Sequence, residues 1–195
     1  LDHPSVLSYL DVLRDHKPVG ERVAIIGAGG IGFDVATYLT HSGESAAVNP
    51  KKFYAEWGID THSGAHSGLC APLVEPSSKE VYLLQRKPTK VGKDLGVSTG
   101  WIHRAALNKR NVAMIPGATY RRIDDQGLHI TVNGEEQLLA VQNVVICAGQ
   151  LPERSLVNDL GEAGLSVHII GGSDQAAELD AKRAINQGVR LAARL

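Results

Sequence analysis

Uninterrupted apolar runs alternate with amphipathic or glycine-rich segments along most of the chain. Such runs are typical of parallel strands that are covered on both faces of a sheet. The pattern predicts strands at 22–26, 81–87, 112–117, 143–149 and 167–172, and helices at 4–16, about 30–40, 99–110 and 180–195. Because strands and helices alternate, we expect an α/β fold with a Rossmann-like, doubly wound parallel sheet.

Three short segments with alternating apolar and polar positions interrupt this order. They lie at 120–123, 128–132 and 137–141, and turn-forming residues separate them. The second separator contains Asn133-Gly134, a dipeptide that favours a tight hairpin turn. The pattern therefore predicts a small antiparallel meander beside the parallel sheet.

Residues 41–79 form a long connection that is rich in Gly, Ser, His and Pro. A connection of this length is more often a functional segment or an insertion than a plain linker. His62, His66 and Cys70 follow one another at intervals of four, which on a helix would align three zinc ligands. The glycines and serines between them disfavour a helix, so we expect an ordinary loop and no metal site.

Composition narrows the class of protein without identifying it. The chain has 195 residues, 43% of them hydrophobic, and a net charge of −1, which gives no sign of a nucleic-acid or membrane partner. Its two cysteines argue against a disulfide framework and for a cytoplasmic location. They also exclude a four-cysteine iron–sulfur cluster within these residues. Because the first residue is Leu1, we expect the chain to be processed or cut from a longer one.

A glycine motif joins the first long strand to the helix that follows it. Gly27, Gly29 and Gly32 have the G-x-G-x-x-G spacing of dinucleotide-binding turns. The first glycine allows the tight turn, the second allows the backbone to approach the pyrophosphate, and the third allows close helix packing. The amides of Gly30 and Ile31, at the positive end of the helix, would face the phosphates.

The strand at 81–87 ends in cations where an NAD site would place a carboxylate. Arg86 and Lys87 end the strand, Lys90 and Lys93 follow, and Asp94 is the one acid among them. Cations at this point are typical of an NADP(H) site, because they bind the 2′-phosphate of the cofactor. We therefore assign Arg86, Lys87 and Lys93 to NADP(H) binding; the alternative is a solvated strand end.

Two segments near the C-terminus resemble the closing segments of two-dinucleotide flavoprotein reductases. The first is "VVICAGQLPE", with Ala148 and Gly149, and the second contains Gly171, Gly172 and Asp174 in the order G-G-x-D. In that family the A-x-G strand returns the chain to the FAD domain, and the acid binds the flavin ribityl chain. The resemblance implies FAD contacts for Gly149, Gly172 and Asp174, and Asp174 also suits a helix N-cap.

A closer resemblance covers residues 3–192. The chain is similar there to the C-terminal part of bacterial NADPH-dependent 2,4-dienoyl-CoA reductase, a family related to trimethylamine dehydrogenase. The motifs that carry it are "GERVAIIGAGGIGFDVATYL", "WGID", "LQRK", "TGWIHR" and "ELDAKRAI". The resemblance implies that NADPH reduces FAD, and that electrons then pass through a 4Fe-4S cluster to FMN. The FMN would reduce a dienoyl-CoA to an enoyl-CoA in fatty-acid β-oxidation.

The same resemblance implies a division into domains. Residues 1–20 would be a helix and linker from the FAD domain, and 21–145 the NADP(H)-binding domain with 41–79 inserted. Residues 146–195 would be the return segment of the FAD domain. The (β/α)8 barrel with FMN and the cluster, and the first FAD glycine turn, would be partners outside these residues, because only one G-x-G-x-x-G occurs here. We nominate no catalytic residue, since hydride transfer between a nicotinamide and a flavin needs orientation above all.

Two related readings stay open. The chain could be the equivalent part of an enoate reductase or an amine dehydrogenase, or a nucleotide-binding domain without catalysis. The pair Arg86-Lys87 disfavours the amine dehydrogenases that do not use NADP(H).

In "TGWIHR", Trp101 could cover a nicotinamide or flavin and Arg104 could reach a phosphate. We favour an amphipathic helix there, with Trp101, Ile102 and Leu107 toward the sheet.

Overall fold

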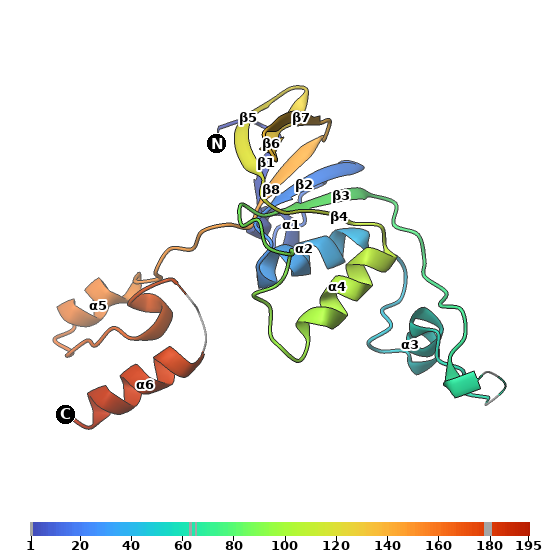
Figure 1. The fold of residues 1–195 in the computed structure, drawn as a ribbon. Helices are drawn as coiled ribbons and strands as arrows, with labels where there is room; N and C mark the ends of the chain where they lie inside the picture. The colour runs from blue at the N-terminus through green and yellow to red at the C-terminus, as the bar shows by residue number, and fades with distance from the viewer. Residues whose placement is uncertain (1, 63, 65, 178–180) are drawn as a thin grey trace. The chain divides into compact units, whose positions relative to one another are not determined.

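The computed structural model describes residues 2–62, 64, 66–177 and 181–195 (Figure 1). The chain forms two compact units, Leu1–Ala148 and Gly149–Leu195. None of the described helices is both long enough and apolar enough to cross a membrane.

A five-stranded parallel sheet organises the first unit. β2 lies at its centre, because it pairs with β8 on one side and with β3 on the other. The strands, in spatial order, are β1 (Val6–Ser8), β8 (Asn143–Ile146), β2 (Arg22–Ile26), β3 (Glu80–Leu84) and β4 (Ala113–Ile115). Ile26 pairs with Leu84 and with Ile146, so the carboxyl ends of the three central strands meet at one edge of the sheet.

Helices cover one face of this sheet. They are α1 (Tyr9–Leu13), α2 (Gly30–Thr40) and α4 (Gly100–Lys109), and α2 and α4 lie beneath the sheet in Figure 1. Ile25 and Leu83 of the strands are fully buried against Phe33 of α2 and Leu107 of α4. The apolar strands therefore supply one core on this side, as doubly covered parallel strands require.

The antiparallel meander covers the opposite face. It consists of β5 (Thr119–Asp124), β6 (Gly127–Val132) and β7 (Glu135–Leu139), above the sheet in Figure 1. Leu128 and Ile130 of β6 pack with Ala24 and Leu84 of the sheet in a second core. The predicted fold class is thus confirmed: a Rossmann-like parallel sheet with a small antiparallel meander.

The helix predicted for residues 4–16 is wrong in its first half. Residues 6–8 form β1, which pairs in parallel with β8, and the helix begins only at Tyr9. Ser8 ends the strand and caps the helix: its side chain accepts from the amide of Asp11, and the carboxylate of Asp11 accepts from the amide of Ser8. This capping box sets the helix start, and a free sheet edge beside β8 takes the preceding apolar residues.

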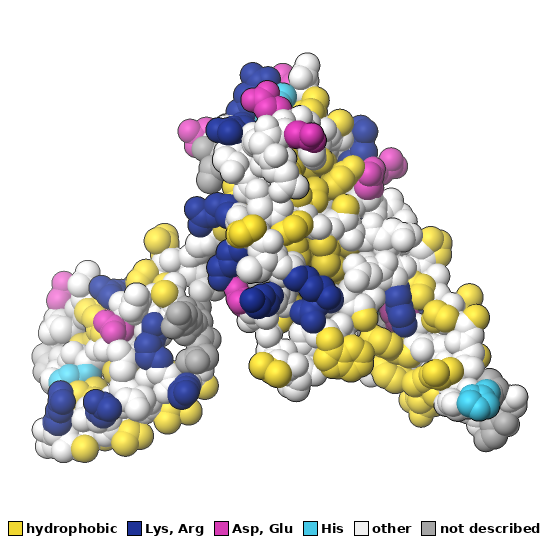
Figure 2. Space-filling view, viewed as in Figure 1, with side chains coloured by type: hydrophobic (Ala, Val, Ile, Leu, Met, Phe, Trp, Pro, Cys, Tyr) yellow, Lys and Arg dark blue, Asp and Glu magenta, His cyan; other side chains and the backbone are white. Residues whose placement is uncertain are grey.

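The long connection contains a helix that the sequence pattern did not predict. α3 (Pro50–Trp57) starts with Asn49 as N-cap and ends at Gly58, which has the left-handed conformation common after helices. A short 3-10 turn follows at His66–Gly68. The rings of Trp57 and of Trp101 in α4 pack edge to face, with their centroids 6.3 Å apart. Figure 2 shows hydrophobic side chains gathered over α3 and α4.

The second unit contains α5 (Leu156–Glu162), a 3-10 turn at Gly171–Ser173 and α6 (Ala181–Ala192). α6 confirms the predicted closing helix, although 178–180 lie outside the described residues. The strand predicted at 167–172 is wrong, because the described part of this unit offers no strand to pair with it. A strand needs a neighbour for its backbone hydrogen bonds. Instead, the amide of Gly171 donates to the side chain of Gln187 at 2.6 Å.

Candidate nucleotide-binding site

Two glycines of the motif are required by packing. Gly27 has φ of +111°, and a Cβ there would lie 2.7 Å from the carbonyl carbon of Cys147. A Cβ on Gly32 would lie 1.8 Å from the carbonyl oxygen of Gly27. The amide of Gly27 donates to the carbonyl of Leu84 at 3.0 Å, which ties the turn to β3. Any larger residue at Gly27 or Gly32 would force the turn away from the sheet.

The remaining motif glycine, Gly29, and its neighbour Gly30 face open space. A Cβ on Gly29 or on Gly30 would meet no described heavy atom within 4 Å. Gly29 is the N-cap of α2 and provides no side chain to bind the first amides of the helix. These amides have no acceptor within the helix, and the helix dipole is positive at this end. The turn thus fits a dinucleotide pyrophosphate: two glycines hold the backbone and two leave its amides accessible.

The segment after β3 is fixed by backbone contacts. The amide of Gln85 donates to Ile115 of β4 at 3.0 Å, and its side-chain amide donates to the carbonyls of Lys87 and Thr89. The carbonyl of Lys87 also accepts from the amide of Gly117 at 3.0 Å. The basic residues therefore project from an anchored loop at the carboxyl edge of the sheet.

Arg86 lines an open cleft of about 700 Å³ on the meander side of the sheet. Ile26 and Ile146 of the central strands and Tyr120 of β5 share the lining. Burial raises the pKa of Tyr120, and the positive charge of Arg86 acts in the opposite direction. Arg86 forms no hydrogen bond or ion pair with another described residue, so its guanidinium is available to an anion.

Lys87 lies in a different environment. Its ammonium contacts Asp94 at 2.5 Å, and both side chains are mostly exposed, at 69% and 67%. The hydrogen bond from Lys87 lowers the pKa of Asp94. Lys93 is exposed and forms no ion pair with a described residue. The structure therefore brings Lys87 close to an acid and puts Arg86 in a cleft that Lys87 does not line.

The candidate FAD residues belong to the second unit. Gly149 has φ of +84° and open space where a Cβ would be, and Gly172 lies in the 3-10 turn. Asp174 ends that turn. We expected Asp174 to suit the N-cap of the closing helix, but α6 begins only at Ala181. The carboxylate of Asp174 accepts from the side chain of Gln187 at 2.8 Å. Their contacts with FAD stay predictions.

α4 differs from the prediction in how its residues are oriented. Leu107 is buried as expected, but Trp101 is 56% exposed and contacts Trp57 rather than the sheet. Arg104 donates to the carbonyl of Gly92 at 2.7 Å and so anchors the loop between β3 and α4. Neither side chain contacts the glycine motif through a described hydrogen bond.

The remaining sequence candidates bring no further chemistry together. Among the described residues no group of three His, Cys, Asp or Glu side chains could hold a metal, and this includes the loop with His62, His66 and Cys70. Cys147 is the cysteine near the glycine turn, and burial raises its pKa to about 12. A thiol with this pKa stays protonated at neutral pH and is a poor nucleophile.

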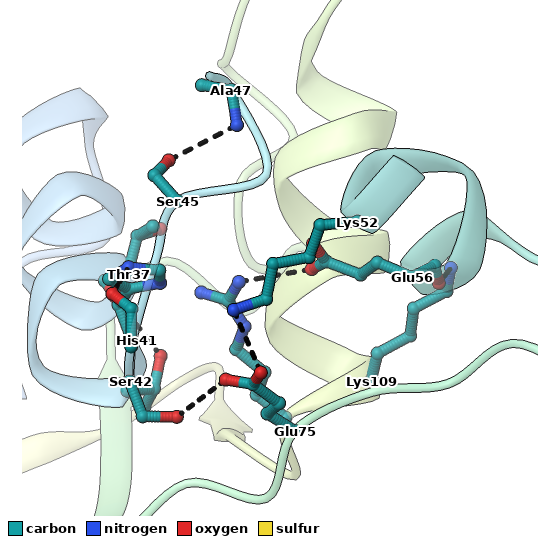
Figure 3. Close-up of polar contacts among 12 residues, drawn as sticks. Thr37, His41, Ser42, Ser45, Ala47, Lys52, Glu56, Glu75 and Lys109 are labelled. Carbon is teal, nitrogen blue, oxygen red and sulfur yellow. Dashed lines mark hydrogen bonds and ion pairs between the residues drawn. The ribbon is translucent and has the colours of Figure 1, made fainter. Parts of the chain in front are cut away.

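A polar cluster that the sequence did not predict lies beside α3 (Figure 3). Lys52 contacts Glu75 at 2.8 Å, and Arg110 contacts Glu56 at 3.1 Å with both side chains largely buried. Lys109 also donates to the backbone carbonyl of Glu56 at 2.9 Å. The two contacts of Glu56 attach the long connection to the C-terminal end of α4, and the contact between Lys52 and Glu75 joins two parts of the connection itself. The signals for α3 were Asn49 before it, Pro50 at its first position and Gly58 after it.

Comparison with known families decides the class of protein. The family model described as "Pyridine nucleotide-disulphide oxidoreductase" matches residues 6–181. The chain belongs to this family. The family is one of oxidoreductases, and membership implies FAD and NAD(P) as the cofactors of the family.

Individual relatives agree with this family assignment. A metal reductase of Desulforamulus reducens is 24% identical over 166 residues, which are 85% of this chain and 24% of that protein. The chain thus spans about a quarter of this relative's length. In structure it is similar to a 2-naphthoyl-CoA reductase, with a TM-score of 0.65, 22% identity, 96% of this chain and 23% of that chain covered.

The 6-hydroxypseudooxynicotine amine oxidase of Pseudomonas geniculata N1 is as similar, with a TM-score of 0.65 and 19% identity over 96% of this chain and 24% of that one. At these identities the likeness shows the fold alone.

Proposed function

We propose that this chain is the NADPH-binding, electron-input part of a larger flavin and iron–sulfur oxidoreductase that reduces 2,4-dienoyl-CoA. The observation that carries the proposal is the turn at Gly29 and Gly30, whose open amides lie at the same sheet edge as the basic loop after β3. The FAD would be shared with protein segments outside this chain, and FMN and the 4Fe-4S cluster would belong to those segments alone.

When bound, NADPH supplies a hydride and FAD accepts it. The residues of this chain would orient the nucleotide. Gly27 and Gly32 hold the turn against β8, β3 and α2, while the first amides of α2 would bind the pyrophosphate. Arg86, Lys87 and Lys93 would attract the 2′-phosphate. Hydride transfer from a nicotinamide to a flavin needs orientation and no acid or base from this chain.

The family motifs favour a dienoyl-CoA, and a solved structure with the same fold is called a naphthoyl-CoA reductase. An amine oxidase has the same fold with an equal score, so the fold does not separate the two classes. The second candidate is therefore the equivalent part of an enoate reductase or amine dehydrogenase. The basic loop favours the reductase, because its cations suit NADPH. A nucleotide-binding domain without catalysis is the third candidate.

Calorimetric titration of the chain with NADPH and NADH tests the cofactor. We expect NADPH to bind at least about tenfold more tightly, since charge-assisted bonds to a phosphate are strong. Arg86→Ala and Lys87→Ala should be measured separately, and at least one of them should reduce this preference. Arg14→Ala removes an exposed cation that pairs with Asp15 and is the matched control. A folded chain that binds neither nucleotide, or both equally, would overturn the assignment to NADPH.

The electron path is tested on the polypeptide encoded by the complete reading frame. NADPH added without oxygen should bleach the flavin absorbance, and a 2,4-dienoyl-CoA should restore it. Restoration by an enoate or bleaching by an amine, with no response to dienoyl-CoA, would replace the substrate assignment. If NADPH does not reduce the flavin of the complete protein, that result would favour a nucleotide-binding domain without catalysis.

A further inference from the structure

We propose that Asp94 lowers the preference of this site for NADPH over NADH by competing with the 2′-phosphate for Lys87. This inference rests on the proposed NADPH binding. It begins with the ion pair between Lys87 and Asp94, whose Nζ and Oδ2 atoms lie 2.5 Å apart. Lys87 has this carboxylate as its one ion-pair partner among the described residues.

The backbones that carry the two side chains are held in place. The carbonyl of Lys87 accepts from Gly117 and from the side chain of Gln85. On the side of Asp94, Val91 is 3% exposed in the core, and Arg104 donates to the carbonyl of Gly92 at 2.7 Å. The acid is thus kept within reach of the lysine by the fold, whereas the side chains themselves are exposed and free to exchange partners.

The single ammonium group of Lys87 cannot pair fully with two anions at the same time. A 2′-phosphate that approaches Lys87 must replace the carboxylate of Asp94 or share the lysine with it, and the two anions repel each other at close range. NADH has a hydroxyl group in place of the phosphate, and a nearby carboxylate can accept its hydrogen bond. Asp94 therefore opposes NADPH and favours NADH at the same loop.

The expected size follows from the exposure of the pair. An exposed ion pair is screened by water and salt, so its loss corresponds to about a two- to fivefold change in affinity. Removing the charge of Asp94 should tighten NADPH binding by about this factor. The effect should shrink as ionic strength rises, because exposed charges are screened within about 10 Å at 0.1 M salt.

Titration of Asp94→Asn with NADPH and NADH tests the inference. We expect the dissociation constant for NADPH to fall about two- to fivefold, while that for NADH stays constant or rises. Asp94→Glu keeps the charge and should retain the preference of the original chain. Asp15→Asn removes a carboxylate from another exposed ion pair, with Arg14, and should change neither constant.

The outcomes separate this inference from the proposed function. If the original chain prefers NADPH but Asp94→Asn does not increase that preference, the role of Asp94 is overturned and the proposed function stands. If the original chain does not bind NADPH, the proposed function falls and the inference falls with it. If Asp15→Asn increases NADPH affinity by the same factor, the change in net charge alone explains the effect, and the role of Asp94 is also overturned.

Discussion

The glycine motif predicts that two single-methyl substitutions in one turn have opposite consequences. In Gly32→Ala the added Cβ would lie 1.8 Å from the carbonyl oxygen of Gly27. The backbone at residue 32 and the backbone at Gly27 must therefore move apart by at least about 1.2 Å before the two atoms reach an allowed contact distance. The side chain of Leu83 at 3.4 Å limits movement in its direction. Overpacking that shifts backbone in a full core costs about 3 kcal/mol of unfolding free energy. For a chain of this length the melting temperature should fall by roughly 6–12 °C.

In Gly29→Ala the added methyl meets no described heavy atom, and φ of −84° with ψ of −171° is extended backbone that alanine adopts. Alanine is a poorer N-cap than glycine, which costs about 0.5–1 kcal/mol. The methyl would, however, occupy the space through which a pyrophosphate approaches the amides. We expect NADPH affinity to fall on the order of tenfold with nearly full stability.

Thermal unfolding by circular dichroism and calorimetric titration of both variants give the comparison. Gly161→Ala is the control for the methyl itself, because that glycine also has open space and lies in α5. A Gly29→Ala variant that unfolds as readily as Gly32→Ala, or that binds NADPH like the original chain, would contradict this prediction.

Other predictions concern the thiols and the long connection. Because burial raises the pKa of Cys147 from 9.0 to about 12, the unfolded chain loses this proton first as the pH rises. Urea unfolding between pH 9 and 11 should show a stability loss of about 1.4 kcal/mol per pH unit that Cys147→Ala removes. At pH 8 a thiol reagent should label the exposed Cys70 and leave Cys147 protected until the chain unfolds. Glu56→Gln leaves Arg110 without its carboxylate and should weaken the attachment of α3 by about 2–3 kcal/mol, visible as faster hydrogen exchange in α3 and a red shift of Trp57 fluorescence. The first prediction is contradicted if Cys147→Ala leaves the pH dependence of stability unchanged, and the second if the reagent labels both thiols of the folded chain. The third is contradicted if hydrogen exchange in α3 does not change in Glu56→Gln.

The sequence predicted the central sheet well because its signals are local. The runs at 22–26 and 143–146 are apolar at nearly every position, and the structure buries them under two layers. The meander was also predicted from local signals, namely the alternation of apolar and polar residues and the turn residues between the segments. The glycine motif also gave the turn correctly, since both the tight backbone at Gly27 and the close contact at Gly32 follow from the spacing of the motif.

The failures arise where structure depends on distant partners. The apolar residues of β1 suit a strand or a helix, and only the neighbouring β8 decides between them. The segment 167–172 has the composition of a strand but no described strand beside it. Trp101 was assigned to the buried face together with Leu107, yet six residues at 100° each place them about 120° apart around the helix. Its neighbour is Trp57, which belongs to a helix that the sequence pattern did not predict.

The basic residues after β3 lie next to each other in the sequence but not in one site. Arg86 and Lys87 are neighbours in sequence, but both lie in the loop after β3, which ends at Leu84. In the structure Arg86 lines the cleft with Ile26 and Tyr120, whereas Lys87 contacts Asp94. A fork made of both residues is therefore not preformed. A single phosphate would be bound by the guanidinium of Arg86 alone, which can bind it bidentately, or by the single ammonium group of Lys87 after its release from Asp94. The two single variants must consequently differ in their effect on NADPH, and only Lys87 should respond to the loss of Asp94.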